Sequence, residues 1–205
     1  MSTEPRWFAR PGVLDPDHPG TLNPVYEVLD YPIVLGRADE TCMTAEASAG
    51  AAPAELSYET VLERVAKLAG VLRLLDVRPG VPVRIGSDVP ALPARLARLA
   101  VIRIGGLLVE DPAAEARVAF SAAEDEPTRD VHQAFSKPVR RLPSYYEGVQ
   151  IATAERSVAL DPVVRDPRIE PGAAAQLPAD LVVIRRADGT EVTARELIGE
   201  LDLHS

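Results

Sequence analysis

Residues 57–110 read SYETVLERVAKLAGVLRLLDVRPGVPVRIGSDVPALPARLARLAVIRIGGLLVE. Apolar residues from Val61 to Leu75 recur at the i, i+3 and i+4 intervals that place them on one face of an amphipathic helix. Charged residues occupy the other face, Ser57 is placed to begin the helix, and Pro79-Gly80 ends it. The residues between Ser57 and Pro79-Gly80 therefore predict one long surface helix that packs on a core through its apolar face.

A strand and a second helix follow directly. Val81 to Ile85 is a short strand candidate, Leu92 to Ile104 has helical spacing, Gly105-Gly106 ends that helix, and residues 107–110 begin another strand. The outward face of the second helix is expected to carry Arg95, Arg98 and Arg103. The alternation of helices and strands predicts an α/β fold with a mostly parallel sheet, flanking helices and right-handed crossovers.

The N-terminal flank carries weaker signals. Residues 24–35 have apolar side chains at helical spacing, with Asn23 as the predicted N-cap. Pro32 is expected to end or kink this short helix, because proline lacks the backbone N–H. Residues 41–47 are a strand candidate, and the Ala/Gly-rich residues 47–54 predict a flexible turn.

The C-terminal flank predicts a strand, a turn and a helix. Leu181 to Arg186 is a short apolar strand, Asp188-Gly189 is a turn, and Thr193 with Glu196 forms a capping box that begins the final helix. Further strand candidates lie at 116–120 and 149–153. No internal repeat is evident.

These signals divide the chain into one domain with an arm. Residues 1–23 form an extended arm, 24–160 the α/β domain and 161–180 a proline-rich linker, and the strand, turn and helix of 181–205 pack on the same domain. The aromatic side chains expected to dock the arm are Trp7, Phe8 and Tyr26.

The composition excludes several classes of protein. The net charge of −9 disfavours a nucleic-acid partner, because an acidic surface repels phosphates. The single cysteine, Cys42, permits no internal disulfide and is interpreted as a small buried side chain. We find no signal peptide and no apolar run long enough to span a membrane, so we expect a soluble cytoplasmic protein.

Three blocks of the sequence resemble the acetyl- and propionyl-CoA synthetases, which are AMP-forming acyl-CoA ligases of the adenylate-forming superfamily. The blocks are Arg6-Trp7-Phe8 with the segment Leu22 to Asp30; Leu56 to Glu59 with Val77-Arg-Pro-Gly80 and Val83-Arg-Ile85; and Leu99 to Gly106. They stand in the family's order and spacing and span about half of the chain. One departure is Glu27, where the family usually has Asn. The resemblance implies a partial ligase-like N-terminal subdomain.

The same resemblance implies little chemistry in this half. Such ligases hold ATP with a Ser/Thr/Gly-rich loop. The residues that support Mg²⁺ and the catalytic lysine come later in a ligase sequence, after the position that corresponds to Ser205. Asp188, Gly189 and Thr190 are interpreted as a degenerate form of this nucleotide loop. The acidic side chains there disfavour the binding of phosphate. We therefore expect a truncated, catalytically incomplete homologue that carries no catalytic residue and needs no cofactor.

Five basic residues are the candidate contacts for a phosphate or for CoA: Lys137, Arg140, Arg141, Arg185 and Arg186. For the first three, a solvated loop is favoured over a phosphate grip. The three histidines, His18, His132 and His204, have no metal-ligand spacing, so no metal site is predicted.

Two functions remain open. The first is a non-catalytic binding or assembly protein that covers an apolar face by self-association or with a protein partner, for which an enzyme of acyl-CoA metabolism is a candidate. The alternative is a subunit that completes a split ligase in trans. ATP, AMP or CoA would bind only in that case.

Overall fold

The computed structural model describes residues 23–45, 54–123, 146, 148–198, 200, 201 and 203. Its helices are the π-helix η2 (Tyr26–Asp30), α1 (Tyr31–Val34), α2 (Tyr58–Leu74), α3 (Ala91–Arg103), α4 (Leu160–Val164) and α5 (Ala194–Leu197). Its strands are β1 (Thr41–Ala45), β2 (Ala54–Ser57), β3 (Pro82–Ile85), β4 (Leu107–Val109), β5 (Val118–Ala122), β6 (Val149–Ala152), β7 (Ser157–Ala159), β8 (Val182–Arg185) and β9 (Glu191–Thr193).

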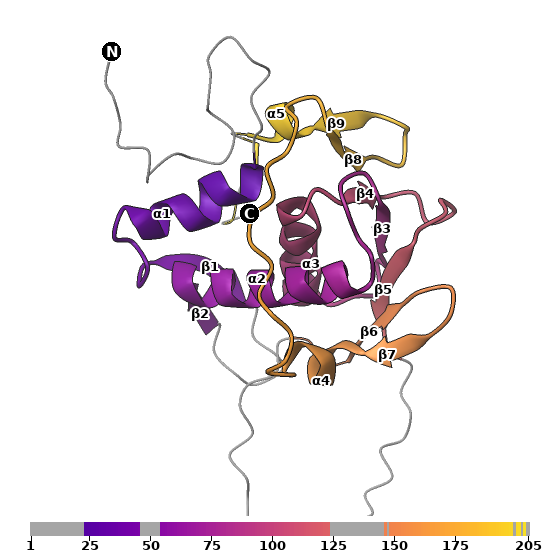
Figure 1. Ribbon diagram of the computed structural model, residues 1–205, viewed down its shortest axis with the longest axis horizontal. Coiled ribbons are helices and arrows are strands. Elements are labelled where there is room, and N and C mark those ends of the chain that lie inside the picture. Colours follow the sequence, from indigo (N-terminus) through magenta and orange to yellow (C-terminus); the bar gives the residue numbers. More distant parts are fainter. Residues whose placement is uncertain are drawn as a thin grey trace, which may run out of the picture.

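Seven of these strands form one sheet in the order β7-β6-β5-β3-β4-β8-β9 (Figure 1). Its centre, β5-β3-β4-β8, is parallel, and the strands at both edges pair antiparallel. Val83, Val118 and Ile184 of the central strands are at most 1% exposed, as expected for a sheet centre covered by other elements. The predicted α/β fold is confirmed, with its parallel pairing confined to the centre.

The two predicted long helices are present and pack against each other. Ser57 caps α2 by accepting a hydrogen bond from the backbone N–H of Thr60. α3 contacts β3 and β4, while α2 lies on α3 and contacts η2, β1 and β2 (Figure 1). The apolar faces read from the sequence are buried, so the sequence and the packing agree for this half of the chain.

The predicted exposure of Arg103 is wrong. Its side chain is buried, and its guanidinium donates to both carboxylate oxygens of Asp30, with N–O distances of 2.5 and 2.9 Å. Its Nε donates to the carbonyl of Gly172 at 2.9 Å. Helical periodicity assigned this residue to the solvent face, but η2 and the segment before β8 cover that face, and they come from distant parts of the chain.

Asn23 completes the same cluster. Its side-chain oxygen accepts from the backbone N–H of Tyr26, which confirms the predicted N-cap, and its amide donates to the carbonyls of Arg103 and Ala175 at 2.9 and 2.8 Å. The helix that follows widens into η2 before Pro32 and continues to Val34. The wider turn lies where Pro32 has no N–H to donate, so the proline alters the helix without ending it at once.

Residues 165–181 connect α4 to β8 and cross α2, with turns at both ends and residues 170–177 between them; the segment is drawn in orange in Figure 1. The segment is hydrogen-bonded to α2: Gly172 N–H donates to the carbonyl of Ala66, and Lys67 and Arg73 donate to the carbonyls of Ile169 and Ala173.

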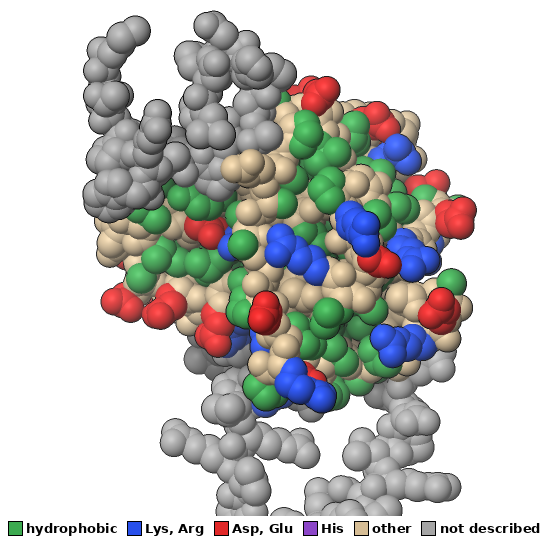
Figure 2. Space-filling model, viewed as in Figure 1, with side chains coloured by type: hydrophobic (Ala, Val, Ile, Leu, Met, Phe, Trp, Pro, Cys, Tyr) green, Lys and Arg blue, Asp and Glu red, His purple; other side chains and the backbone are tan. Residues whose placement is uncertain are grey.

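On the face that Figure 2 shows, basic and acidic side chains are interspersed, so the acidic excess forms no continuous patch there. The division of the chain into an arm, a domain and a linker stays a prediction.

Two parts of the structure share a local arrangement, an antiparallel strand pair followed by a helix. β1–β2–α2 and β8–β9–α5 are both hairpins whose second strand runs directly into a helix cap, Ser57 or Thr193. In both strand pairs, the first residue of the first strand pairs with the N-cap residue, and the pairing then shifts by one residue, between 41 and 43 and between 182 and 184. Thr193 and Glu196 form the predicted capping box, but α5 ends after one turn.

The buried ion pair gives a first stability prediction. Asp30→Asn should lower the free energy of unfolding by about 3–5 kcal/mol, because it leaves the Arg103 guanidinium buried without its counter-charge. Asp76→Asn is the matched control, since the Asp76–Arg78 pair is solvent-exposed and should contribute less than about 1 kcal/mol. Urea unfolding followed by circular dichroism measures both, and equal effects would contradict the role given to the buried pair.

A second stability prediction concerns the contact between α2 and the segment that crosses it. A Cβ on Gly70 would lie 2.0 Å from the carbonyl oxygen of Glu170, so that backbone must move. Gly70→Ala should destabilise the fold by about 1–3 kcal/mol. Helix propensity alone predicts the opposite sign, a gain of about 1 kcal/mol. A raised melting temperature in this variant would show that the segment does not lie tightly on α2.

Candidate functional site

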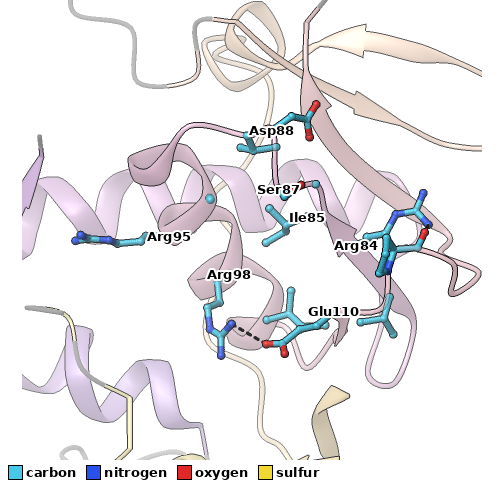
Figure 3. A pocket seen from close by; sticks show the side chains of 13 residues that line it. Arg84, Ile85, Ser87, Asp88, Arg95, Arg98 and Glu110 are labelled. Carbon is cyan, nitrogen blue, oxygen red and sulfur yellow. Dashed lines mark hydrogen bonds and ion pairs between the residues drawn. The ribbon is translucent and has the colours of Figure 1, made fainter. Parts of the chain in front are cut away.

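A cavity of about 590 Å³ opens at the carboxyl ends of β3 and β4, the edge of a parallel sheet where ligands commonly bind (Figure 3). Its floor comes from the ends of these strands and its wall from the first half of α3. It is lined by Arg84, Ile85, Gly86, Ser87, Asp88, Val89, Ala94, Arg95, Arg98, Leu108, Val109, Glu110 and Pro112.

The three arginines of this cavity differ in their contacts. Arg84 donates to the carbonyls of Pro112 and Ala114, both at 2.9 Å, and so holds the connection between β4 and β5. Arg98 makes one ion pair with Glu110, with 3.3 Å between Nη1 and Oε1 (Figure 3). Arg95, one turn earlier on α3, makes no hydrogen bond or ion pair within the described part of the chain. Arg84 is therefore a structural arginine, whereas Arg95 and Arg98 can contact a ligand.

A second cavity of about 320 Å³ adjoins the first, because Arg95 and Arg98 line both. It adds Arg186, which directly follows β8, and a mainly apolar wall. Its lining is Met43, Arg95, Arg98, Leu99, Ile184, Arg186, Leu197, Glu200, Leu201 and Leu203. We call the two cavities together the arginine groove.

The groove is locally basic in an acidic chain. Among the described residues, the two cavities together are lined by four arginines, Arg84, Arg95, Arg98 and Arg186, and by three carboxylates, Asp88, Glu110 and Glu200, which leaves one positive charge in excess. Guanidinium groups bind carboxylates and phosphates through two parallel hydrogen bonds. The arrangement is thus suited to one anionic group attached to an apolar body.

The structure separates the predicted residues Arg185 and Arg186. Arg185 is paired across the β8–β9 ladder with Glu191, at 2.9 Å, whereas Arg186 lines the groove. Tyr26 begins η2 beside the N-cap Asn23. The remaining candidates lie outside the described residues: Trp7, Phe8, Lys137, Arg140, Arg141 and the histidines 18, 132 and 204.

Asp188, Gly189 and Thr190 form the turn of the β8–β9 hairpin. The backbone N–H of Gly189 donates to the carbonyl of Arg186, and that of Thr190 donates to the Asp188 carboxylate at 2.8 Å. The second bond holds the pKa of Asp188 below its usual value. These two N–H groups are used within the turn, so they are not presented to a phosphate.

Cys42 is buried in β1, as predicted. Burial raises the pKa of its thiol to about 12, which keeps it protonated at neutral pH. A protonated buried thiol is a poor nucleophile, so Cys42 belongs to the core and not to a site.

Arg95, Arg98, Glu110 and Glu200 line the groove but were not among the site residues predicted from the sequence. Arg95 and Arg98 were assigned to a solvated helix face. Residues that line a groove have the same sequence spacing on a helix as residues that face solvent. The available signal was their position: two arginines on the helix that follows β3, and a glutamate directly after β4. The carboxyl ends of adjacent parallel strands lie at one edge, which brings such residues together.

No model of a known protein family matches the chain. Close to half of the chain does resemble acyl-CoA synthetases of the adenylate-forming superfamily, which confirms the resemblance inferred from the sequence. In the described part of the chain, no helix has the length and apolar character needed to cross a membrane.

Two curated proteins match part of the chain. One is acyl-CoA synthetase short-chain family member 3, mitochondrial, from Rattus norvegicus, with 37% identity over 43% of this chain. The other is Uncharacterized protein PA3568 from Pseudomonas aeruginosa, with 35% identity over 50% of this chain. The matched segments span 13% and 15% of these relatives' own lengths.

Two solved structures overlap with a similar share of the chain. Acetoacetyl-CoA synthetase from Streptomyces lividans has 31% identity over 43% of this chain and 13% of its own, with a TM-score of 0.38. A fatty acyl-adenylate ligase from L. pneumophila has 20% identity over 42% of this chain and 15% of its own, with a TM-score of 0.37.

The contacts of the arginines predict different effects on stability. Arg84→Ala should lower the free energy of unfolding by about 1–2 kcal/mol, since two carbonyls lose a charged donor. Arg95→Ala should change it by less than about 0.5 kcal/mol, as expected for a side chain without such contacts. Chemical denaturation of both variants measures this, and a large loss for Arg95→Ala would assign that residue a structural role.

Proposed function

We propose that the chain is a binding or assembly protein related to the acyl-CoA ligases, and that it holds an anionic acyl compound in the arginine groove. The observation that carries this proposal is the cavity in which Arg95, Arg98 and Arg186, from α3 and the end of β8, face an apolar wall. A short acyl carboxylate has both required parts, a planar anion and a hydrocarbon tail.

Charge balance favours a carboxylate over ATP or CoA. The groove has one positive charge in excess, which a carboxylate neutralises. A polyphosphate would bring several negative charges next to Glu110 and Glu200, and the unmatched charges would oppose binding. ATP, AMP and CoA are therefore expected to bind more weakly than a short carboxylate.

The groove supports binding better than it supports chemistry. Its cations hold an anion, and the turn at residues 188–190 uses its N–H groups internally. A subunit of a split ligase would use the same groove, but a partner would have to supply the phosphate loop and the lysine. Self-association or a protein partner also remains part of the proposal; the large apolar side chains exposed in the described part are Val34, Leu35, Leu74 and Ile198.

Calorimetry and thermal shift with acetate, propionate, butyrate, AMP, ATP, CoA and acetyl-CoA test the proposal. The native protein should bind a short carboxylate saturably and melt at a higher temperature in its presence. Arg95→Gln and Arg186→Gln should each weaken this binding about tenfold, because a charge-assisted hydrogen bond is lost. The control Arg117→Gln removes an exposed arginine outside the groove and should have no effect.

Three outcomes would contradict this function. One is the absence of saturable binding by any of these anions, and another is unchanged affinity in the Arg95 and Arg186 variants. The third is formation of AMP from ATP and a carboxylate by the purified chain alone, which would show that it is an enzyme in its own right.

A further inference from the structure

We infer that Glu110 is a gating residue of the arginine groove. Its carboxylate forms an ion pair with Arg98 until a ligand carboxylate displaces it, and its negative charge opposes the binding of polyanions. This inference rests on the proposed function and adds a determinant of ligand specificity. It starts from the placement of Arg98, which lines both cavities, and of Glu110, which is its ion-pair partner.

The backbone of Glu110 is fixed while its side chain is accessible. Its N–H donates to the carbonyl of Arg185 at 2.9 Å, which ties residue 110 to β8 beside Arg186. Its side chain is 40% exposed and that of Arg98 is 41% exposed. The carboxylate can therefore rotate into solvent without any change in the sheet.

The Arg98–Glu110 contact is weak enough to be exchanged. It is a single contact at 3.3 Å between half-exposed groups, and such surface pairs contribute little to stability. A ligand carboxylate on Arg98 gains charged hydrogen bonds from that guanidinium, as Glu110 does. When the ligand carboxylate takes the place of the Glu110 carboxylate, Arg98 still pairs with one negative charge. A monoanionic ligand can therefore replace Glu110 as the ion-pair partner of Arg98.

A polyanion meets a different situation. Once displaced, the Glu110 carboxylate remains attached to the end of β4, close to the bound ligand, and Glu200 lines the same groove. Each additional negative charge on the ligand is repelled by these carboxylates. Glu110 thus sets the preference for one anionic charge and lowers the affinity for every anion.

Calorimetry with sodium propionate and with ATP, at one ionic strength, tests this role. Glu110→Gln keeps the shape of the side chain and removes its charge. This variant should bind propionate about three- to tenfold more tightly than the native protein, and its affinity for ATP should rise by a larger factor. Glu115→Gln is the matched control, an exposed glutamate in the same connection between β4 and β5, and should leave both affinities unchanged.

A double-mutant cycle with Arg98→Gln separates gating from a general effect of surface charge. If Glu110 acts through Arg98, Glu110→Gln should have much less effect on propionate binding in the Arg98→Gln background. The inference is overturned if Glu110→Gln behaves like Glu115→Gln, or if its full effect persists without Arg98.

The two proposals fail in different ways. If the native protein binds propionate through Arg95 and Arg186 while Glu110→Gln changes nothing, only the gate is refuted. If neither the native protein nor Glu110→Gln binds any probe, the proposed function fails and the gate falls with it. Binding that appears only in Glu110→Gln would contradict both proposals, because a ligand would then not displace Glu110 in the native protein.

Discussion

The buried ion pair between Arg103 and Asp30 is the constraint on which the other parts of the structure depend. It joins the C-terminal end of α3 to η2, and the same guanidinium holds Gly172 in the segment that leads to β8. Asn23 adds bonds from the helix start to Arg103 and Ala175. Three distant segments are thus fixed at one end of α3. The first and third sequence blocks that resemble the acyl-CoA synthetases meet in this cluster, so Asn23, Asp30 and Arg103 of these blocks serve the fold here.

Fixing one end of α3 also determines what its other end presents. The first half of the helix lies at the carboxyl ends of β3 and β4, where Arg95 and Arg98 form the wall shared by the two cavities. The second cavity is lined from both ends of the chain: β1 supplies Met43, and β8 with the residues after it supplies Ile184, Arg186 and Leu197. The groove therefore combines the half of the chain that resembles ligases with the C-terminal β8, β9 and α5.

Local patterns predicted the helices, and long-range contacts explain most of what the sequence analysis missed. Periodicity and caps gave α2, α3 and the Thr193–Glu196 capping box, because these features depend on neighbours within a few residues. Arg103 was placed outward because only distant residues cover its face. The short strands β2 and β9 were missed because each ends in the N-cap of the next helix, Ser57 or Thr193. Arg95 and Arg98 have the spacing of a solvated helix face, so only the sheet topology identifies them as a groove.

The central claim is that the arginine groove, and no other arginine cluster of the described chain, receives a short carboxylate. The most direct measurement is a titration with propionate monitored by ¹H–¹⁵N NMR of the arginine side-chain Nε–H groups. The account predicts saturable shifts with one dissociation constant for Arg95, Arg98 and Arg186, while Arg84 and Arg103, which are held by carbonyls and by Asp30, stay unchanged. Shifts spread evenly over all arginines, or none at saturating propionate, would contradict it.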